Sequence, residues 1–242
     1  MIYEWKLEGK TRNFGDALYE LFLPFDVQGE FESDLKTLYF TVGSVICNEV
    51  ISESLAQGFF PVFLNCGWRG EELDPILAAQ CEFVGARGPN TQAALARVGV
   101  TVEVTLDPAY RLPALLPKGE SNGLAICVRH IKDPSPVTID TIFEYKADAM
   151  FSPVIEDRED LAAFVEKISG ARFVLAGSLH AAIVAHAYGV PFALLGGDHI
   201  DCPAKWEDWL ASVNITNIQW VDNVIDGRKW HNTAVKKGAE TE

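Results

Sequence analysis

The sequence predicts an α/β protein with two halves, each built on a parallel sheet covered by helices. Short apolar runs alternate with amphipathic stretches along most of the chain, which is typical of parallel α/β sheets. The segment at 112–123 interrupts this alternation with two prolines and two glycines among polar residues, and the alternation then resumes. We therefore expect two Rossmann-like halves, at 1–113 and 121–225, that face each other across a cleft, and a C-terminal tail at 226–242.

The first half repeats a strand–helix pattern. Gly99 follows the last amphipathic stretch of this half and is expected to end that helix. The strands are predicted at 38–40, 61–65, 83–86 and 102–106, and the helices at 16–23, 48–57, 75–80 and 90–98.

The second half repeats the pattern with more strongly apolar runs. We expect the polar residues at 236–242 to fray. The strands are predicted at 124–128, 173–175, 192–194 and 219–221, and the helices at 138–146, 160–168, 179–188 and 204–212.

Composition excludes several classes of protein. Hydrophobic residues make up 48% of the 242-residue chain and charged residues 22%, which is typical of a globular protein and not of a disordered one. The net charge of -14 repels nucleic acid and anionic lipid, so neither is expected as a partner. An anionic substrate would need local positive charge to offset this field.

Cysteine usage and the N-terminus indicate a reducing compartment. The five cysteines are scattered and odd in number, which argues against a disulfide framework and a zinc site. The chain opens without the basic and apolar regions of a signal peptide, and no apolar run approaches the roughly 18 residues of a membrane span. We expect a cytoplasmic protein that can visit the inner face of the membrane.

Ligands of open parallel sheets bind at the turns that follow the strands, so these turns are the places to search for chemistry. The turn at 12–16 opens the first predicted helix. Asn13 can cap that helix, Gly15 lets another group approach the backbone, and Asp16 offers a carboxylate. The alternative is a plain capping turn.

Two further turns in the first half can hold an anion. Gly43 and Ser44 lie between a strand and a helix, where free N–H groups and a hydroxyl form a generic anion seat. Arg87 ends a strand just before a helix that starts at Pro89, a position that suits a carboxylate or a phosphate. The alternatives are an empty turn at 43–44 and a surface arginine that pairs with one of the 34 acidic residues.

The turn at 177–180 carries the strongest signal. Ser178 can cap a nearly all-apolar helix, and His180 falls in its first turn, where anions bind. The alternative is a histidine bonded to nearby backbone, which is also the favoured interpretation of His186 in the middle of the helix. Arg129 and His130 end the strand at 124–128 and are expected at the same cleft. The acidic and histidine residues at 198–202 match no metal motif and are expected to form a loop.

These motifs, in this order, resemble those of the polysaccharide pyruvyl transferase family, and in particular the ketal pyruvyl transferases of bacterial exopolysaccharide synthesis. The similarity runs nearly end to end. It includes the segments at 13–16, 43–44, 85–89 with the helix ending at Gly99, 106–109, 178–184 with 189–191, and 205–209.

The resemblance implies a fold like that of the two-domain GT-B glycosyltransferases, with the acceptor at the first half and the donor at the second. It also implies phosphoenolpyruvate as the donor and a sugar hydroxyl pair, commonly on a lipid-linked oligosaccharide, as the acceptor. The chain departs from the family in one place. Several members carry a donor-holding arginine where this chain has Ser178, so Arg129, Arg87 or Lys205 would have to replace it.

Pyruvyl transfer from phosphoenolpyruvate requires a proton donor for the methylene carbon and cations for a carboxylate and a phosphate. His180 is the candidate acid and Asp16 the candidate base, with Arg87 and Arg129 as clamps aided by Ser44 and Ser178. The scheme requires no metal or other cofactor. Two alternatives stay open at this point, namely a glycosyltransferase that uses a nucleotide sugar and a binding protein that kept the fold without activity.

Overall fold

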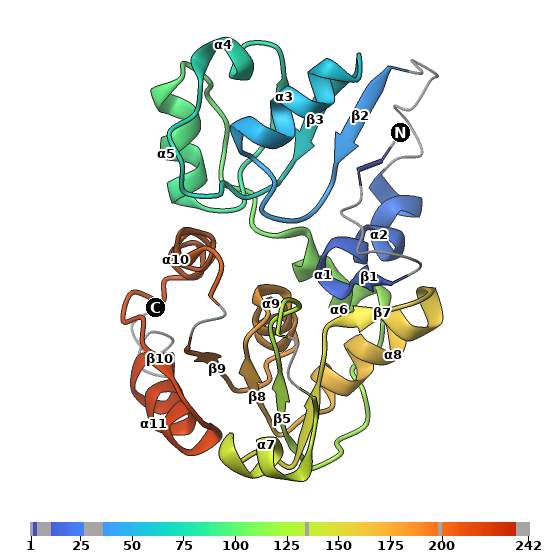
Figure 1. Ribbon diagram of the computed structural model, residues 1–242, viewed down its shortest axis with the longest axis vertical. Helices are drawn as coiled ribbons and strands as arrows, with labels where there is room; N and C mark the ends of the chain where they lie inside the picture. Colours follow the sequence, from blue (N-terminus) through green and yellow to red (C-terminus); the bar gives the residue numbers. More distant parts are fainter. Residues whose placement is uncertain (1, 4–10, 27–35, 134–135, 198–199, 236–242) are drawn as a thin grey trace. The chain divides into compact units, whose positions relative to one another are not determined.

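The computed structural model describes residues 2–3, 11–26, 36–133, 136–197 and 200–235. It confirms an α/β protein with parallel sheets (Figure 1). The chain divides into two compact units. The first unit comprises Met1–Trp5, Tyr19–Pro108 and Cys202–Asn214, and the second comprises Lys6–Leu18, Ala109–Asp201 and Ile215–Glu242.

The first unit contains a three-stranded parallel sheet in the order β2-β3-β4. Phe40, Phe63 and Phe83 are register partners on the three strands, and their rings stack with centroids 4.4 and 5.1 Å apart. This ladder belongs to a core that also holds Ile46 and Leu95. The elements of this unit are α2 (Tyr19–Asp26), β2 (Thr37–Phe40), α3 (Asn48–Ala56), β3 (Phe60–Leu64), α4 (Pro75–Ala78), β4 (Glu82–Val84), α5 (Pro89–Arg97) and α10 (Pro203–Ser212).

The second unit contains a five-stranded parallel sheet in the order β10-β9-β8-β5-β6. Every residue of the three central strands is buried, which explains why these strands appear in the sequence as continuous apolar runs. Its strands and helices are β1 (Arg12–Asn13), α1 (Phe14–Ala17), α6 (Leu112–Leu115), β5 (Ala125–Val128), α7 (Ile139–Glu144), β6 (Ala149–Phe151), β7 (Val154–Ile155), α8 (Arg158–Ser169), β8 (Phe173–Ala176), α9 (Leu179–Ala187), β9 (Phe192–Leu195), β10 (Trp220–Val221) and α11 (Val224–Ala234).

Most of the predicted elements are present, but the strand predicted at 102–106 is not. Only a single parallel bridge forms there, between Ala86 and Val104. Ala86 donates to the carbonyl of Glu103 and accepts from the N–H of Thr105, so the segment is pinned at one residue. In the second unit, β6 joins the sheet beside β5 and was missed because its run of three residues is too short to show a period.

The two units are not the continuous halves that the sequence predicted. The chain segment that carries α1 belongs to the second unit, and α10 belongs to the first. The physical reason for the second exchange is a buried bond network, in which Asp208 of α10 accepts from the backbone N–H and the hydroxyl of Thr91 at the start of α5.

The segment at 112–123 was predicted as a linker but is packed on the second unit, so the boundary lies before it, at Pro108. Leu112 is fully buried, and the N–H of Gly119 donates to the hydroxyl of Ser169. A side chain at Gly119 would overlap the backbone of α8 at Glu166. Gly119 therefore lets this segment lie directly against α8.

The tail predicted at 226–242 also needs correction, because α11 extends to Ala234. Asn223 caps this helix by accepting from the N–H groups of Ile225 and Asp226. Trp230 is 2% exposed, and Gly227 lets the helix lie directly against Ala193 of β9. The helix therefore forms part of the core of the second unit. The fraying predicted at 236–242 lies outside the described residues.

Candidate functional site

The turn from β8 into α9 places His180 at the carboxyl end of a central strand of the second unit. Ser178 occupies the N-cap position of α9, although its side chain makes no capping hydrogen bond. His180 is the second residue of this helix and is 6% exposed. The helix that follows is buried from Leu179 to Ala185, so the histidine ring is held at the entrance of an apolar helix.

Helix α1 lies against this histidine because Gly15 has no side chain. A methyl group at residue 15 would overlap the ring of His180. The carbonyl of the Asn13 side chain accepts from the N–H of Gly15, at 3.2 Å, and its amide donates to the carboxylate of Asp16, at 2.9 Å. Asn13, Gly15 and Asp16 are thus brought to His180 as one capped turn.

The adjacent strand β5 ends beside the same turn. A side-chain carbon at Gly177 would lie 3.0 Å from the backbone nitrogen of His130, so the turns after β5 and β8 pack closely. Arg129 forms an ion pair with Asp133 at 3.4 Å, and His130 Nε2 lies 3.5 Å from a carboxylate oxygen of Asp201. Both basic side chains are at least nine-tenths buried.

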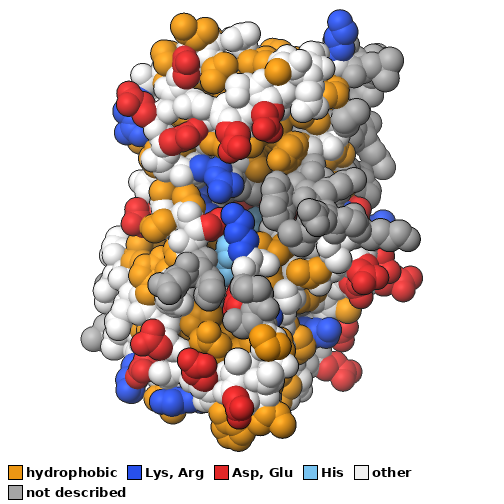
Figure 2. Space-filling model, in the orientation of Figure 1, with side chains coloured by type: hydrophobic (Ala, Val, Ile, Leu, Met, Phe, Trp, Pro, Cys, Tyr) orange, Lys and Arg blue, Asp and Glu red, His pale blue; other side chains and the backbone are white. Residues whose placement is uncertain are grey.

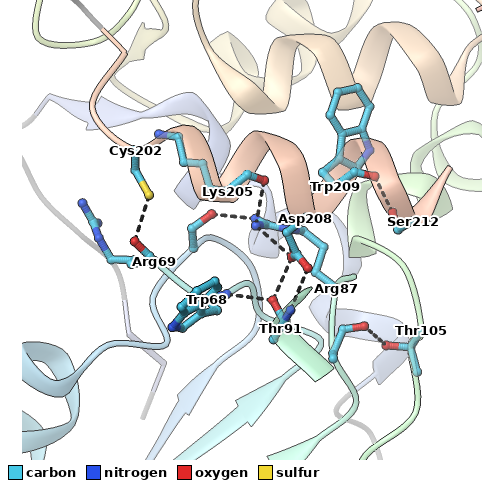
Figure 3. Close-up of polar contacts among 12 residues, drawn as sticks. Trp68, Arg69, Arg87, Thr91, Thr105, Cys202, Lys205, Asp208, Trp209 and Ser212 are labelled. Atoms are coloured by element: carbon cyan, nitrogen blue, oxygen red, sulfur yellow. Dashed lines mark hydrogen bonds and ion pairs between the residues drawn. The ribbon is translucent and has the colours of Figure 1, made fainter. Parts of the chain in front are cut away.

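Arg87 occupies a different environment, inside the first unit (Figure 3). It is fully buried and pairs with Asp208 of α10, with Nε and Nη2 each 3.3 Å from the same carboxylate oxygen. Its other bonds go to the hydroxyl of Ser44, at 2.6 Å, and to the carbonyl of Lys205, at 3.1 Å. The guanidinium therefore ties α10 to the carboxyl ends of the strands. Arg87 pairs with an acid, as the alternative proposed, but it is buried and not at the surface.

Two glycines make this network possible. A side chain at Gly67 would overlap the guanidinium of Arg87, and one at Gly88 would overlap the backbone carbonyl of Asp208. The hydroxyl of Thr91 joins the same cluster, since it donates to Asp208 and accepts from the N–H of Trp68. Residues from the turns after β2, β3 and β4 thus converge on one carboxylate of α10.

The anion seat predicted at Gly43 and Ser44 is not at a helix N-terminus. Helix α3 begins four residues later, at Asn48, whose N–H donates to the carboxylate of Glu71. Gly43 has φ of 104°, a conformation that favours glycine, and its carbonyl accepts from the N–H of Gly67. The turn therefore serves the packing of the first unit. The first N–H group of α3 is bound by Glu71 of the same chain.

Positive charge is compensated at both arginines that the sequence proposed as clamps. Arg87 faces Asp208, and Arg129 faces Asp133. Figure 2 shows the acidic side chains of the visible face in separate small groups. The net charge of the chain is -14. Among the residues that the structure describes, no group of three or more His, Cys, Asp or Glu side chains could hold a metal ion. Asp198 and His199 of the loop predicted at 198–202 lie outside that set.

Comparison with known proteins identifies the family. A model of the polysaccharide pyruvyl transferase family matches residues 54–199. The chain belongs to the polysaccharide pyruvyl transferase family. It is 28% identical over 216 residues to the succinoglycan biosynthesis protein ExoV of Rhizobium meliloti, a match that covers 88% of this chain and 65% of that protein's length.

A solved structure of an uncharacterized protein from Klebsiella pneumoniae is 15% identical, with a TM-score of 0.47 and coverage of 76% of this chain and 75% of that one. The region that matches the pyruvyl transferase family model includes Arg87, Arg129, Ser178 and His180. The turn of Asn13, Gly15 and Asp16, the turn of Gly43 and Ser44, and Lys205 lie outside it. No helix in the described part of this pyruvyl transferase family member is both long and apolar enough to cross a membrane.

Sequence reasoning missed the acidic partners of the basic residues. Asp208 lies between the buried Trp206 and Trp209, and a lone acid within an apolar helix stripe is the signal that could have marked it. Asp133 and Asp201 stand in loops, where nothing in the sequence distinguishes them from solvent-exposed acids. His186 Nδ1 bonds to the hydroxyl of Tyr110, and burial together with nearby His231 lowers the pKa of His186.

All five cysteines are free thiols. Burial raises the pKa of Cys81 and of Cys127 to about 12 and also raises the pKa of Cys47. Thiols in this state are poor nucleophiles and poor metal ligands, so their role is packing.

Proposed function

We propose that this protein transfers a pyruvyl group from phosphoenolpyruvate to a pair of hydroxyls on a sugar of a polysaccharide precursor and forms a cyclic ketal. The observation that carries the proposal is His180, held by Gly15 at the start of α9 in a member of the pyruvyl transferase family. Histidine is the side chain that most often acts as a general acid, and a proton donor is the first requirement of the reaction.

In the proposed mechanism, His180 protonates the methylene carbon of the donor. The neighbouring carbon becomes electron-poor and is attacked by an acceptor hydroxyl. Phosphate then leaves and the second hydroxyl closes the ketal. Rigid placement of the acid matters because proton transfer to carbon depends strongly on alignment. The packing of His180, at the start of α9, against the capped turn of α1 supports such rigidity.

The donor's negative charges need groups other than Arg87, because that guanidinium is buried against Asp208. In our proposal, Arg129 and the N-terminal N–H groups of α9 at Ser178 bind the donor. Arg129 also pairs with an acid, Asp133, but 8% of its side chain is exposed, whereas the side chain of Arg87 is fully buried. Arg129 follows β5, directly beside the β8–α9 turn. Helix α9 is nine residues long, so its first N–H groups can bind an anion. Lys205 belongs to the first unit, where its carbonyl anchors Arg87, and its side chain stays a candidate for binding the acceptor or the donor.

The remaining expectations stay proposals. They are a GT-B-like arrangement of two Rossmann-like halves with a cleft, a lipid-linked oligosaccharide as acceptor, a cytoplasmic location and transient contact with the inner face of the membrane. The chain spans 65% of the length of its relative ExoV, so these properties need tests on this protein itself.

The test combines ligand binding with turnover. Phosphoenolpyruvate should raise the midpoint of thermal unfolding, by a stabilisation of about 2.7 kcal/mol at a concentration of 100 times Kd. With acceptor present, the protein should release phosphate. His180→Asn should keep the thermal shift and lose about 10²–10⁴-fold in turnover, because asparagine cannot deliver a proton.

Arg172→Ala, which removes an exposed ion pair with Asp148, is the control and should keep both signals. Protection by nucleotide sugars without any effect of phosphoenolpyruvate would favour a glycosyltransferase and overturn the proposal. Near-normal turnover in His180→Asn would remove that residue from the acid role.

A further inference from the structure

Ketal formation requires a base as well as an acid, because each acceptor hydroxyl must lose its proton. The sequence offered Asp16 for this role. In the structure, the carboxylate of Asp16 accepts from the side-chain amide of Asn13 and so helps to form the cap of α1. Removing that carboxylate from its partner would loosen the turn that holds Gly15 against His180. Asp16 therefore serves the acid's packing better than it serves a second proton transfer.

Two other carboxylates lie near the end of β5, and their partners distinguish them. Asp133 pairs with Arg129, and its side chain is 5% exposed. The carboxylate of Asp133 is bound by the guanidinium and nearly closed to solvent, so an acceptor hydroxyl has little access to it. Asp201 faces His130 at 3.5 Å, and its side chain is 20% exposed, so a substrate hydroxyl can reach it while it remains held in place.

The hydrogen bond to His130 determines which of its ring nitrogens carries the proton. Its Nδ1 accepts the backbone N–H of Lys132 at 3.2 Å. The proton of the neutral imidazole therefore sits on Nε2, the nitrogen that faces Asp201. In this tautomer His130 cannot itself accept a proton at Nε2, but it can orient the carboxylate by donating toward it.

This pair lies at the same edge of the sheet as the proposed acid. Strands β5 and β8 are parallel neighbours, so their carboxyl ends meet at one edge. The backbone nitrogen of His130 is packed against Gly177, and His180 follows three residues after that glycine. His180 therefore follows β8, and His130, which faces Asp201, follows the adjacent strand β5.

We propose that Asp201 is the catalytic base that takes the proton from an acceptor hydroxyl, and that His130 is the positioning residue that orients it. This inference rests on the proposed pyruvyl transfer. The O–H bond of the acceptor breaks as its proton passes to a carboxylate oxygen of Asp201, and the hydroxyl oxygen bonds to the central carbon of the donor. His180 gives a proton to the methylene carbon, which becomes the methyl group.

The C–O bond to phosphate then breaks, and the electron pair leaves with the phosphate, which takes the proton from Asp201. The second hydroxyl attacks the same carbon and gives its proton to the restored carboxylate of Asp201, from which it returns to His180 through solvent. Of the two protons released by the acceptor, one restores His180 and the other leaves with the phosphate. The balance is complete without an oxidant, a reductant or a further reactant.

The experiment measures phosphate release from phosphoenolpyruvate with two acceptor probes, a panel of methyl hexopyranosides and bacterial lipid-linked oligosaccharides. Asp201→Asn keeps the shape of the side chain but cannot take up the proton. We expect kcat to fall about 10²–10⁴-fold while the thermal shift caused by phosphoenolpyruvate is retained. Asp226→Asn, the same change at an exposed position of α11, is the control and should keep the wild-type rate.

The positioning role of His130 is tested by two variants. His130→Gln keeps an N–H donor on its side chain and should retain more of kcat than His130→Ala, with the same KM for phosphoenolpyruvate in both. Equal losses in the two variants would show that only packing matters there and would overturn the positioning role.

The outcomes separate the two proposals. No phosphate release by the wild-type protein with either probe contradicts the proposed function itself, and the assignment of Asp201 with it. An active wild-type protein with an equally active Asp201→Asn variant overturns this inference alone. A loss in Asp16→Asn without a loss in Asp201→Asn returns the base role to Asp16.

Discussion

Close packing at one glycine connects the start of the chain to the proposed acid. Gly15 is buried in α1, and its missing side chain leaves the space that the ring of His180 fills. Alanine is otherwise the better residue in a helix, so the cost of a methyl group here is purely steric. The position therefore offers a way to move the acid without changing its chemistry.

Gly15→Ala should displace the His180 ring and reduce turnover by about 100-fold, because a misplacement of about 1 Å can cost that much. The fold should persist, since α1 is short and lies near the start of the described chain. Phosphate release and circular dichroism of the variant measure the two effects.

A double-mutant cycle checks that the histidine ring is the cause. The stability lost in Gly15→Ala should be largely restored in Gly15→Ala/His180→Ala, because two of the three nearest atoms belong to the ring. Additive losses in stability would contradict the contact.

Helix α10 packs on the carboxyl edge of the first unit's sheet through a buried polar network. Asp208 of α10 is fully buried and accepts hydrogen bonds from Arg87, in the turn after β4, and from Thr91, at the start of α5. A buried ion pair of this kind contributes little net stability when intact, but it is costly to break, because the remaining charge has no partner.

Asp208→Ala should therefore destabilise the protein by about 3–5 kcal/mol, since it leaves Arg87 as an uncompensated buried charge. Urea unfolding of the wild-type and variant proteins measures the difference in the free energy of unfolding. Arg172→Ala is the matched control, because its pair with Asp148 is about half exposed and should be worth about 0–1 kcal/mol after solvent screening. A loss at Asp208 no larger than that of the control would show that the network is not a structural link.

Stability of the whole molecule should depend on pH through His186, a partly buried histidine of the second unit. Burial, with His231 nearby, lowers the pKa of His186 below its usual value of 6.5. The unfolded chain then binds this proton more readily than the folded one. The stabilising contribution is complete above about pH 6.5 and is lost as the pH falls through the lowered folded pKa.

The prediction is that the free energy of unfolding falls as the pH drops below 6.5, with His186 contributing at most about 1.4 kcal/mol per pH unit. His186→Gln keeps an acceptor for the hydroxyl of Tyr110 but does not titrate, so its pH dependence should be flatter. Urea unfolding at several pH values between 5 and 7.5 compares the two proteins, and identical slopes would rule out His186 as the source.

By itself, the sequence determined the α/β class, most of the strands and helices, and the turn that carries His180, because each of these depends on local patterns. Apolar runs predict buried strands, and a capping residue followed by an apolar helix predicts the position of the histidine. Membership of the pyruvyl transferase family also follows from local motifs in order. The sequence alone therefore indicates the family resemblance and the residues of the β8–α9 turn.

Only the tertiary structure decided what those residues touch. It assigned Arg87 to Asp208 and to internal packing, joined α10 to the first unit and α1 to the second, and placed Asp201 beside His130. The members of each pair are distant in sequence. A charged residue gives the same local sequence pattern whether its partner is a substrate or a buried acid. The physical reason is that ion pairs and steric fits are long-range properties of the packed chain, whereas the sequence reports only local periodicity and propensity.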